Sequence, residues 1–88
     1  MLHVMSNEEE LESRRQNFDR IKPNTLFNFA TVSKNNEINV RYCIAVSSSN
    51  DAWVVIELTE KNKKKITNGD SCPKVIISFD EMHCLNVP

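Results

Sequence analysis

Residues 59–79 decide the fold, and they read T-E-K-N-K-K-K-I-T-N-G-D-S-C-P-K-V-I-I-S-F. Thr59 is a suitable N-cap, and the lysines of the following turns suit the negative end of a helix. Asn68-Gly69 is a typical helix stop. We therefore predict a short cationic helix over about residues 60–68 and a strand over about 74–80. A hairpin turn at Asn68-Gly69 is the alternative reading of the same stretch.

Three apolar segments precede this helix and have the period of two that is typical of strands. They predict strands over about 25–33, 37–47 and 52–59. A turn at 34–37 contains Asn35-Asn36, and asparagine tolerates the positive φ that hairpins need. A second turn is expected over 47–51, with Ser47-Ser48-Ser49 as turn residues. Consecutive strands joined by short turns make an antiparallel meander.

The two ends of the chain give weaker signals. Residues 7–21 are expected to form a helix, because Ser6 and Glu9 read as a capping box and Pro23 ends the segment. Leu11, Phe18 and Ile21 give it a thin apolar stripe, so it should pack on a sheet or cover the end of a barrel. Residues 80–88 are polar and predict no clear element.

Size and composition indicate one small domain over residues 1–88, of the α+β class and mainly β. The formal net charge of −1 provides no field that would recruit nucleic acid or an anionic membrane. No apolar run is long enough to span a bilayer. The cysteines are Cys43, Cys72 and Cys84, an odd number without C-x-x-C spacing, which favours reduced thiols and a cytoplasmic location.

Several charged or chemically active residues have more than one reading. In the strand 37–47, Ile38, Val40 and Tyr42 share the apolar face, whereas Arg41 lies on the polar face. Arg41 could pair with Glu57 across two strands or bind an anion. The lysines of 61–65 could be a solvated face, an anion site or, less favoured, a nucleic-acid contact.

Other candidates carry little chemistry. Cys72, His83 and Cys84 match no zinc spacing, and Cys43 with His83 has no local signature of a nucleophile pair. Trp53 could pack under the helix or lie at a subunit interface, where aromatic residues are enriched.

The order of the elements and four short motifs resemble the pyridoxamine 5′-phosphate oxidase-like family of FMN-binding split β-barrels. The motifs are Phe29-Ala30-Thr31-Val32-Ser33, Asn39-Val40-Arg41-Tyr42-Cys43, Lys64-Lys65 before Ile66-Thr67-Asn68, and Pro73-Lys74-Val75. They are similar to the family's L-A-T-V strand, its arginine-bearing second strand, its basic pair and its N-P-x-V entry into the next strand. The resemblance covers about residues 11–79.

The resemblance implies a partial split β-barrel that forms a homodimer and binds FMN, a phosphorylated cofactor, at the subunit interface. Carried over by position, Arg41, Lys64 and Lys65 would hold the flavin phosphate, with Thr59 and Lys63 beside them and Tyr42-Cys43 following the arginine. The implied activity is a flavin-dependent oxidation or reduction of a small molecule, with no catalytic side chain.

Some positions depart from the family's pattern. The family's second-strand proline is Tyr42 here, its helix leucine is Gly69, and its Asn before Pro is Cys72. With only four predicted strands, the chain reads as a truncated barrel. The alternative function is therefore a small interaction module that keeps the scaffold without a cofactor and offers an edge strand to a partner.

Overall fold

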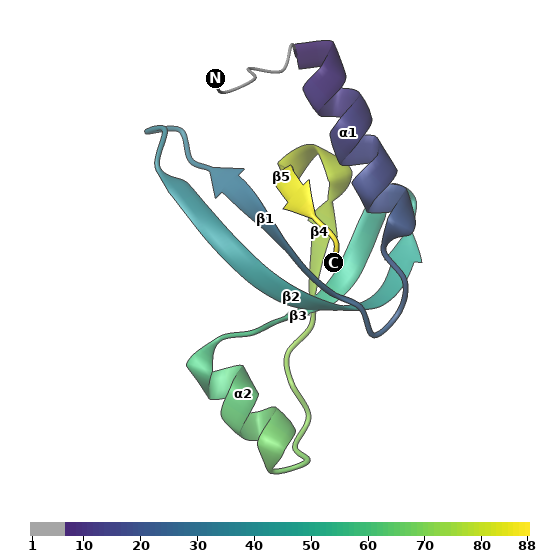
Figure 1. Cartoon of the computed structure of the whole chain (residues 1–88). Helices are drawn as coiled ribbons and strands as arrows, with labels where there is room; N and C mark the ends of the chain where they lie inside the picture. Colours follow the sequence, from purple (N-terminus) through teal and green to yellow (C-terminus); the bar gives the residue numbers. More distant parts are fainter. Residues whose placement is uncertain (1–6) are drawn as a thin grey trace.

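The computed structural model describes residues 7–88, in which two α-helices flank a curled antiparallel sheet (Figure 1). In chain order the elements are α1 (Asn7–Arg20), β1 (Leu26–Val32), β2 (Ile38–Ser49), β3 (Ala52–Glu57), α2 (Glu60–Thr67), β4 (Val75–Ser78), the 3-10 turn η1 (Phe79–Glu81) and β5 (His83–Asn86). The α+β class, mainly β, is the one predicted. Residues 60–67 form the expected helix rather than a hairpin.

The sheet has five strands in the order β4-β3-β2-β1-β5, and all neighbours are antiparallel. Strands β4 and β5 are the two edges, yet only η1 and Met82 connect them. A flat sheet would hold its first and fifth strands about 19 Å apart, which is farther than this tight connection reaches. The sheet therefore curls into an open barrel with its core on the concave side.

The core comes from the face of the meander that looks less apolar in sequence. On β2 the buried side chains are Cys43 and Ala45, and on β3 they are Trp53 and Val55. The other members of the core are Phe18, Ile21, Phe27, Phe29, Ile77, Phe79, Met82 and Leu85. Trp53 is thus a core residue of this barrel. Small residues on β2 leave room inside the curl for the aromatic rings of its neighbours.

The opposite face of the sheet is largely apolar, and much of it is exposed. Its register pairs Leu26 with Ile44 and Val32 with Ile38, so these side chains lie on one side of β1 and β2. We call this the outer face, and its members are Leu26, Val32, Ile38, Val40, Tyr42, Ile44, Val54, Ile56, Leu58 and Ile76. Ile38 and Ile76 are each 71% exposed and Tyr42 is 58% exposed. The water-facing side of an antiparallel sheet is normally polar, so this face is unusual.

Helix α1 covers the β5 side of the barrel. Phe18 and Ile21 are buried, whereas Leu11 of the predicted stripe is exposed. Asn17 Nδ2 donates to the Leu85 carbonyl over 2.7 Å, and Arg14 Nη1 donates to His83 Nδ1 over 3.2 Å. Within the described residues the helix runs from Asn7 to Arg20, and Ser6 of the predicted capping box lies outside them.

Two sequence predictions are wrong. Residues 80–88 are not without structure, because η1 and β5 occupy most of them and β5 pairs with β1. Ser47-Ser48-Ser49 belong to β2, and the turn lies at Asn50-Asp51, which have φ of 46° and 59°. The other predicted turn is confirmed, with Asn36 at φ 58°. No helix among residues 7–88 is both long and apolar enough to cross a membrane.

Candidate functional site

The candidate site lies where β3 ends opposite β2. The register pairs Cys43 with Glu57, and Leu58 N donates to the Tyr42 carbonyl over 2.8 Å. One residue beyond Tyr42 and Leu58, the same register would set Thr59 opposite Arg41. Thr59 has already turned away as the N-cap of α2, with its hydroxyl accepting from Asn62 N over 3.1 Å. On its β1 side Arg41 is paired with Phe29, but on the other side it has no paired residue, because β3 has ended.

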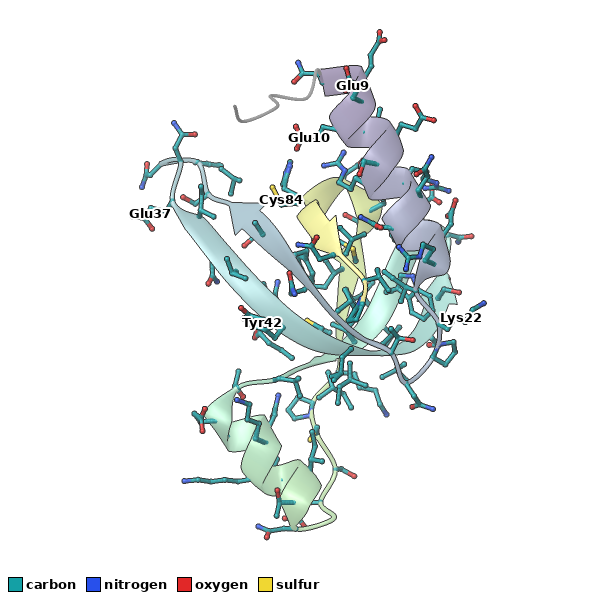
Figure 2. The ribbon with its side chains drawn as sticks, in the orientation of Figure 1. Glu9, Glu10, Lys22, Glu37, Tyr42 and Cys84 are labelled. Carbon is teal, nitrogen blue, oxygen red and sulfur yellow. The ribbon has the colours of Figure 1, made fainter. Side chains whose placement is uncertain are left out.

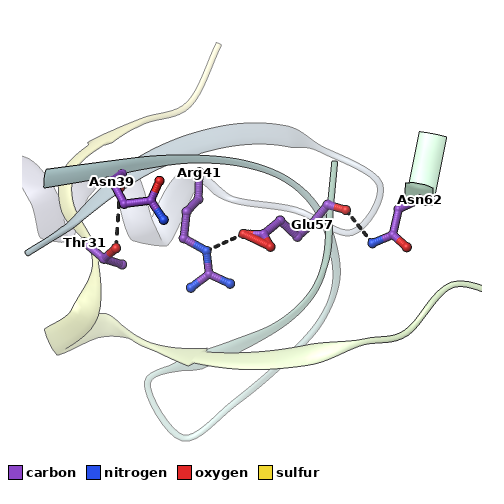
Figure 3. Close-up of polar contacts among 5 residues, drawn as sticks. All are labelled: Thr31, Asn39, Arg41, Glu57 and Asn62. Carbon is purple, nitrogen blue, oxygen red and sulfur yellow. Dashed lines mark hydrogen bonds and ion pairs between the residues drawn. The ribbon is translucent and has the colours of Figure 1, made fainter. Parts of the chain in front are cut away.

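Arg41 is held at this place by Glu57. Its Nε donates to Glu57 Oε2 over 2.6 Å, and the two side chains are 21% and 33% exposed (Figure 3). The guanidinium also lies 5.6 Å from the Phe29 ring centre. Its two terminal nitrogens point away from Glu57, and within residues 7–88 they have no hydrogen-bond partner. The ion pair with Glu57, one of the two roles predicted for Arg41, is thus present. It uses only Nε, so the N–H groups of the two terminal nitrogens remain free to donate.

A surface hollow of about 290 Å³ surrounds this arginine. It is lined by Asn39, Val40, Arg41, Tyr42, Glu57, Leu58 and Thr59. Three residues of the predicted cofactor site, Arg41, Tyr42 and Thr59, therefore come together at one place. The hollow combines the Arg41 guanidinium, the Glu57 carboxylate that holds it, the N-cap residue of α2 and apolar side chains. A guanidinium with open donors near a helix N-terminus is a feature of sites for ligands with an anionic group.

Asn62 fixes α2 against the end of β3. Its side-chain Nδ2 donates to the Glu57 carbonyl over 2.7 Å (Figure 3). Its backbone carbonyl accepts from Cys72 Sγ over 3.6 Å. Asn62 is the buried residue of α2. Sequence reasoning missed it, although an uncharged residue within the lysine run 61–65 marks the side of the helix that turns inward.

The predicted lysines lie on α2, which stands away from the barrel (Figure 1). Lys63 and Lys64 line a separate hollow of about 250 Å³ together with Glu60, Thr67 and Asn68. Lys63 Nζ lies 3.4 Å from Glu60 Oε1. Lys65 is half-buried and lines neither hollow. The two hollows follow each other along the chain at Thr59–Glu60 without sharing a lining residue.

Cys43, also predicted at the cofactor site, lies in the core. Burial raises the pKa of its thiol to about 11, although the nearby Arg41 opposes that shift. The thiol is therefore protonated and unreactive at neutral pH. Cys43 and Tyr42 also line an apolar hollow of about 230 Å³ with Leu26, Phe27, Asn28, Leu58 and Pro88.

No group of three or more His, Cys, Asp or Glu side chains within residues 7–88 is arranged to hold a metal ion.

Comparisons with protein-family models, with curated proteins and with solved structures each give no match for this chain.

Proposed function

We propose that this chain is an FMN-binding protein of the pyridoxamine 5′-phosphate oxidase-like kind, with the flavin phosphate at Arg41. The observation that carries the proposal is the arginine itself, fixed through Nε while Nη1 and Nη2 remain open in a hollow. Two parallel donors match two oxygens of a phosphate. The order of the elements and the curled sheet agree with the split-barrel resemblance.

Other groups near Arg41 suit the same ligand. Thr59, the N-cap of α2, lines the hollow, so the dipole of this helix favours a negative charge nearby. Val40, Tyr42 and Leu58 provide apolar walls of the kind that a ring system packs against. Lys64 and Lys65 lie on the same helix and raise the local potential without lining the hollow.

In this proposal the protein binds and orients, and bound FMN supplies the redox chemistry for a small-molecule substrate. Glu57 positions the guanidinium, and Asn62 in turn holds the Glu57 backbone. No side chain of this chain is assigned a catalytic role. We place the protein in the cytoplasm, because its three cysteines are free and reduced thiols persist there.

The test is a titration of the purified chain with FMN, followed by flavin fluorescence, with riboflavin as the phosphate-free comparison. We expect saturable FMN binding that Arg41→Gln weakens roughly tenfold to a hundredfold, since bonds to a charged group contribute about 1.5–3 kcal/mol. Lys64→Ala with Lys65→Ala should weaken it less. Arg20→Gln is the matched control, because Arg20 is an exposed arginine on α1. Equal affinity in wild type and Arg41→Gln, or equal affinity for riboflavin, would remove the phosphate assignment.

A second candidate function is an interaction module without a cofactor. The exposed outer face favours it, because large uncharged patches mark surfaces that bind other macromolecules. A colourless purified protein that does not bind FMN in this titration would support it over the flavoprotein.

A further inference from the structure

Strand β2 extends past the end of β3, and this part of it has a neighbouring strand on one side only. β3 pairs with β2 only as far as Cys43, whereas β1 pairs with β2 as far as Ile38. Among the strands of residues 7–88, none lies beside residues 38–41 on the side away from β1 (Figure 1). We call this side of residues 38–41 the free edge of β2. It belongs to a central strand, so it is distinct from the two edges of the sheet at β4 and β5.

The backbone groups that point outward from the free edge belong to Ile38 and Val40. Figure 2 shows Glu37 at the tip of the hairpin and Tyr42 at the end nearer to α2, on either side of these residues. The Tyr42 carbonyl accepts from Leu58 N on the side of β3, whereas the Glu37 carbonyl accepts from the β1 arm of the hairpin over 2.9 Å. Successive residues of a strand direct their N–H and C=O groups to opposite sides, so Ile38 and Val40 face the same side as Tyr42. No hydrogen bond within residues 7–88 reaches these groups, which are therefore open to a further strand.

The side chains at the free edge alternate in chemistry. Ile38 and Val40 lie on the outer face and are 71% and 52% exposed, while Asn39 and Arg41 lie on the other face. Directly opposite residues of neighbouring antiparallel strands place their side chains on the same face. A strand added here would therefore fit best with an acidic residue opposite Arg41 and a polar residue opposite Asn39. The two residues opposite Val40 and Ile38 would be apolar.

One end of the free edge is closed. Leu58 already lies opposite Tyr42, and Thr59 turns away as the N-cap of α2. A strand added in line with β3 must therefore begin opposite Arg41. The hollow of about 290 Å³ lies at this place, so the first residue of the added strand would enter it.

We propose that the free edge of β2 binds an extended segment of another protein, antiparallel to β2, with an acidic side chain opposite Arg41. The antiparallel direction is that of every strand pair in this sheet. Charge complementarity selects the acidic residue, because Glu57 occupies only Nε of Arg41 and both terminal nitrogens can still donate. The backbone of the segment supplies the remaining hydrogen bonds, as in other cases of strand addition. The inference goes beyond the FMN proposal and gives the interaction module a partner of stated chemistry.

A second copy of this chain fits the free edge poorly. Two free edges related by a twofold axis would pair Ile38 of each copy with Val40 of the other. That register brings the hairpin turn of the other copy, with its Asn36, to the position opposite Tyr42, which Leu58 already occupies. A separate segment that begins at the closed end of the edge avoids this clash.

The probe is the peptide Glu-Val-Thr-Val with an acetylated N-terminus and an amidated C-terminus. It is titrated into the isotope-labelled full chain without FMN, while NMR records the backbone amide shifts. We expect saturable shifts of the Ile38 and Val40 amides. N-methylation of the peptide's first Val, opposite Val40, should abolish these shifts, because that N–H donates to β2. N-methylation of the Thr should leave the affinity unchanged, because that N–H points away from β2.

The acidic contact is tested by a cycle of two changes. Replacing the peptide's Glu with Gln should weaken binding roughly fivefold to tenfold in wild type, the loss of one charge-assisted pair. In Arg41→Gln the Glu and Gln peptides should bind equally. Arg20→Gln is the matched control and should keep the preference for Glu, because Arg20 is an exposed arginine on α1.

The outcomes separate this inference from the proposed function. Absence of shifts at millimolar peptide, or equal binding of the two N-methylated peptides, would overturn the inference. Protection of the Val40 amide that rises with the concentration of the chain alone would assign the edge to a second copy and overturn it as well. A chain that binds the peptide but no FMN would uphold the inference and remove the proposed function, and binding of FMN alone would do the reverse. If both bind, they should compete, because each uses the terminal nitrogens of Arg41.

Discussion

Arg41 Nε lies 2.6 Å from Glu57 Oε2, although the two residues are diagonal neighbours in the sheet and not opposite each other. Glu57 is paired in register with Cys43, two positions along β2 from Arg41. A long side chain spans such a diagonal readily. The pair therefore sets the direction of the guanidinium at the very end of β3, where α2 begins.

We expect Arg41→Ala to lower the free energy of unfolding by about 1–3 kcal/mol, because it leaves the half-buried Glu57 carboxylate without its donor. Glu57→Gln should cost less, since an amide oxygen still accepts from Nε. Urea unfolding followed by the fluorescence of the buried Trp53 measures both. Lys34→Ala in the exposed hairpin turn is the control, and a loss of similar size there would contradict the assignment.

The raised pKa of the buried Cys43 thiol should make the protein less stable at alkaline pH. Its pKa rises from 9.0 in the unfolded chain to about 11 in the fold, so above about pH 9 the unfolded state gives up the proton first. The protonated thiol therefore contributes its full share of the folding stability below pH 9. The free energy of unfolding falls by roughly 2 kcal/mol as the pH rises from 9 to 11. Denaturant unfolding at several pH values should show a shallower alkaline decline in Cys43→Ala than in wild type. Parallel curves for the two proteins would contradict it.

Asn62→Ala should make α2 open more often while the barrel stays folded. The reason is that the Asn62 side chain donates a hydrogen bond to the Glu57 carbonyl at the end of β3. Losing a half-buried hydrogen bond costs about 1–3 kcal/mol. Amide hydrogen exchange should become faster in residues 63–67 and stay unchanged in β1 and β2. Asn68→Ala, at the exposed end of the same helix, serves as the comparison and should change exchange little.

Gly69→Ala should destabilise the protein by about 1 kcal/mol for a purely conformational reason. Gly69 has φ 75°, which alanine adopts with strain, while the space around a built Cβ is open. The backbone N–H of Asp70 donates to the Lys65 carbonyl over 2.8 Å, so this turn closes α2. Gly69→Asn should cost less, since asparagine visits this region more easily. An alanine variant as stable as wild type would contradict the account.

Local patterns predicted the elements that local chemistry determines. The Thr59 cap, the Asn36 turn and the alternation of β2 each act over a few residues, and all three are present. Strand β5 was missed because its residues, His83 to Asn86, carry little apolar signal and Cys84 has φ 47°. Its existence depends on pairing with β1, which no local pattern encodes.

The two faces of β2 could not be assigned from alternation. Alternation separates the residues into two sets, but which set faces inward depends on the curl of the sheet and on the volume that Phe27, Phe29 and Trp53 fill. The strand register did predict that Arg41 could lie beside Glu57. It could not predict that Lys63 and Lys64 would line a different hollow from Arg41, because α2 lies outside the sheet.

The edge-to-edge connection through η1 also orders the folding reaction. β1 meets β2 across one short turn, but Asn28 meets Asn86 only at a separation of 58 residues. Joining distant segments costs loop entropy before any contact repays it, so such pairings form late. The meander should therefore assemble first, and the seam between β1 and β5 should close last. Until it closes, Phe27 and Phe29 lie open together with the outer face, and aggregation competes with folding most strongly in that interval.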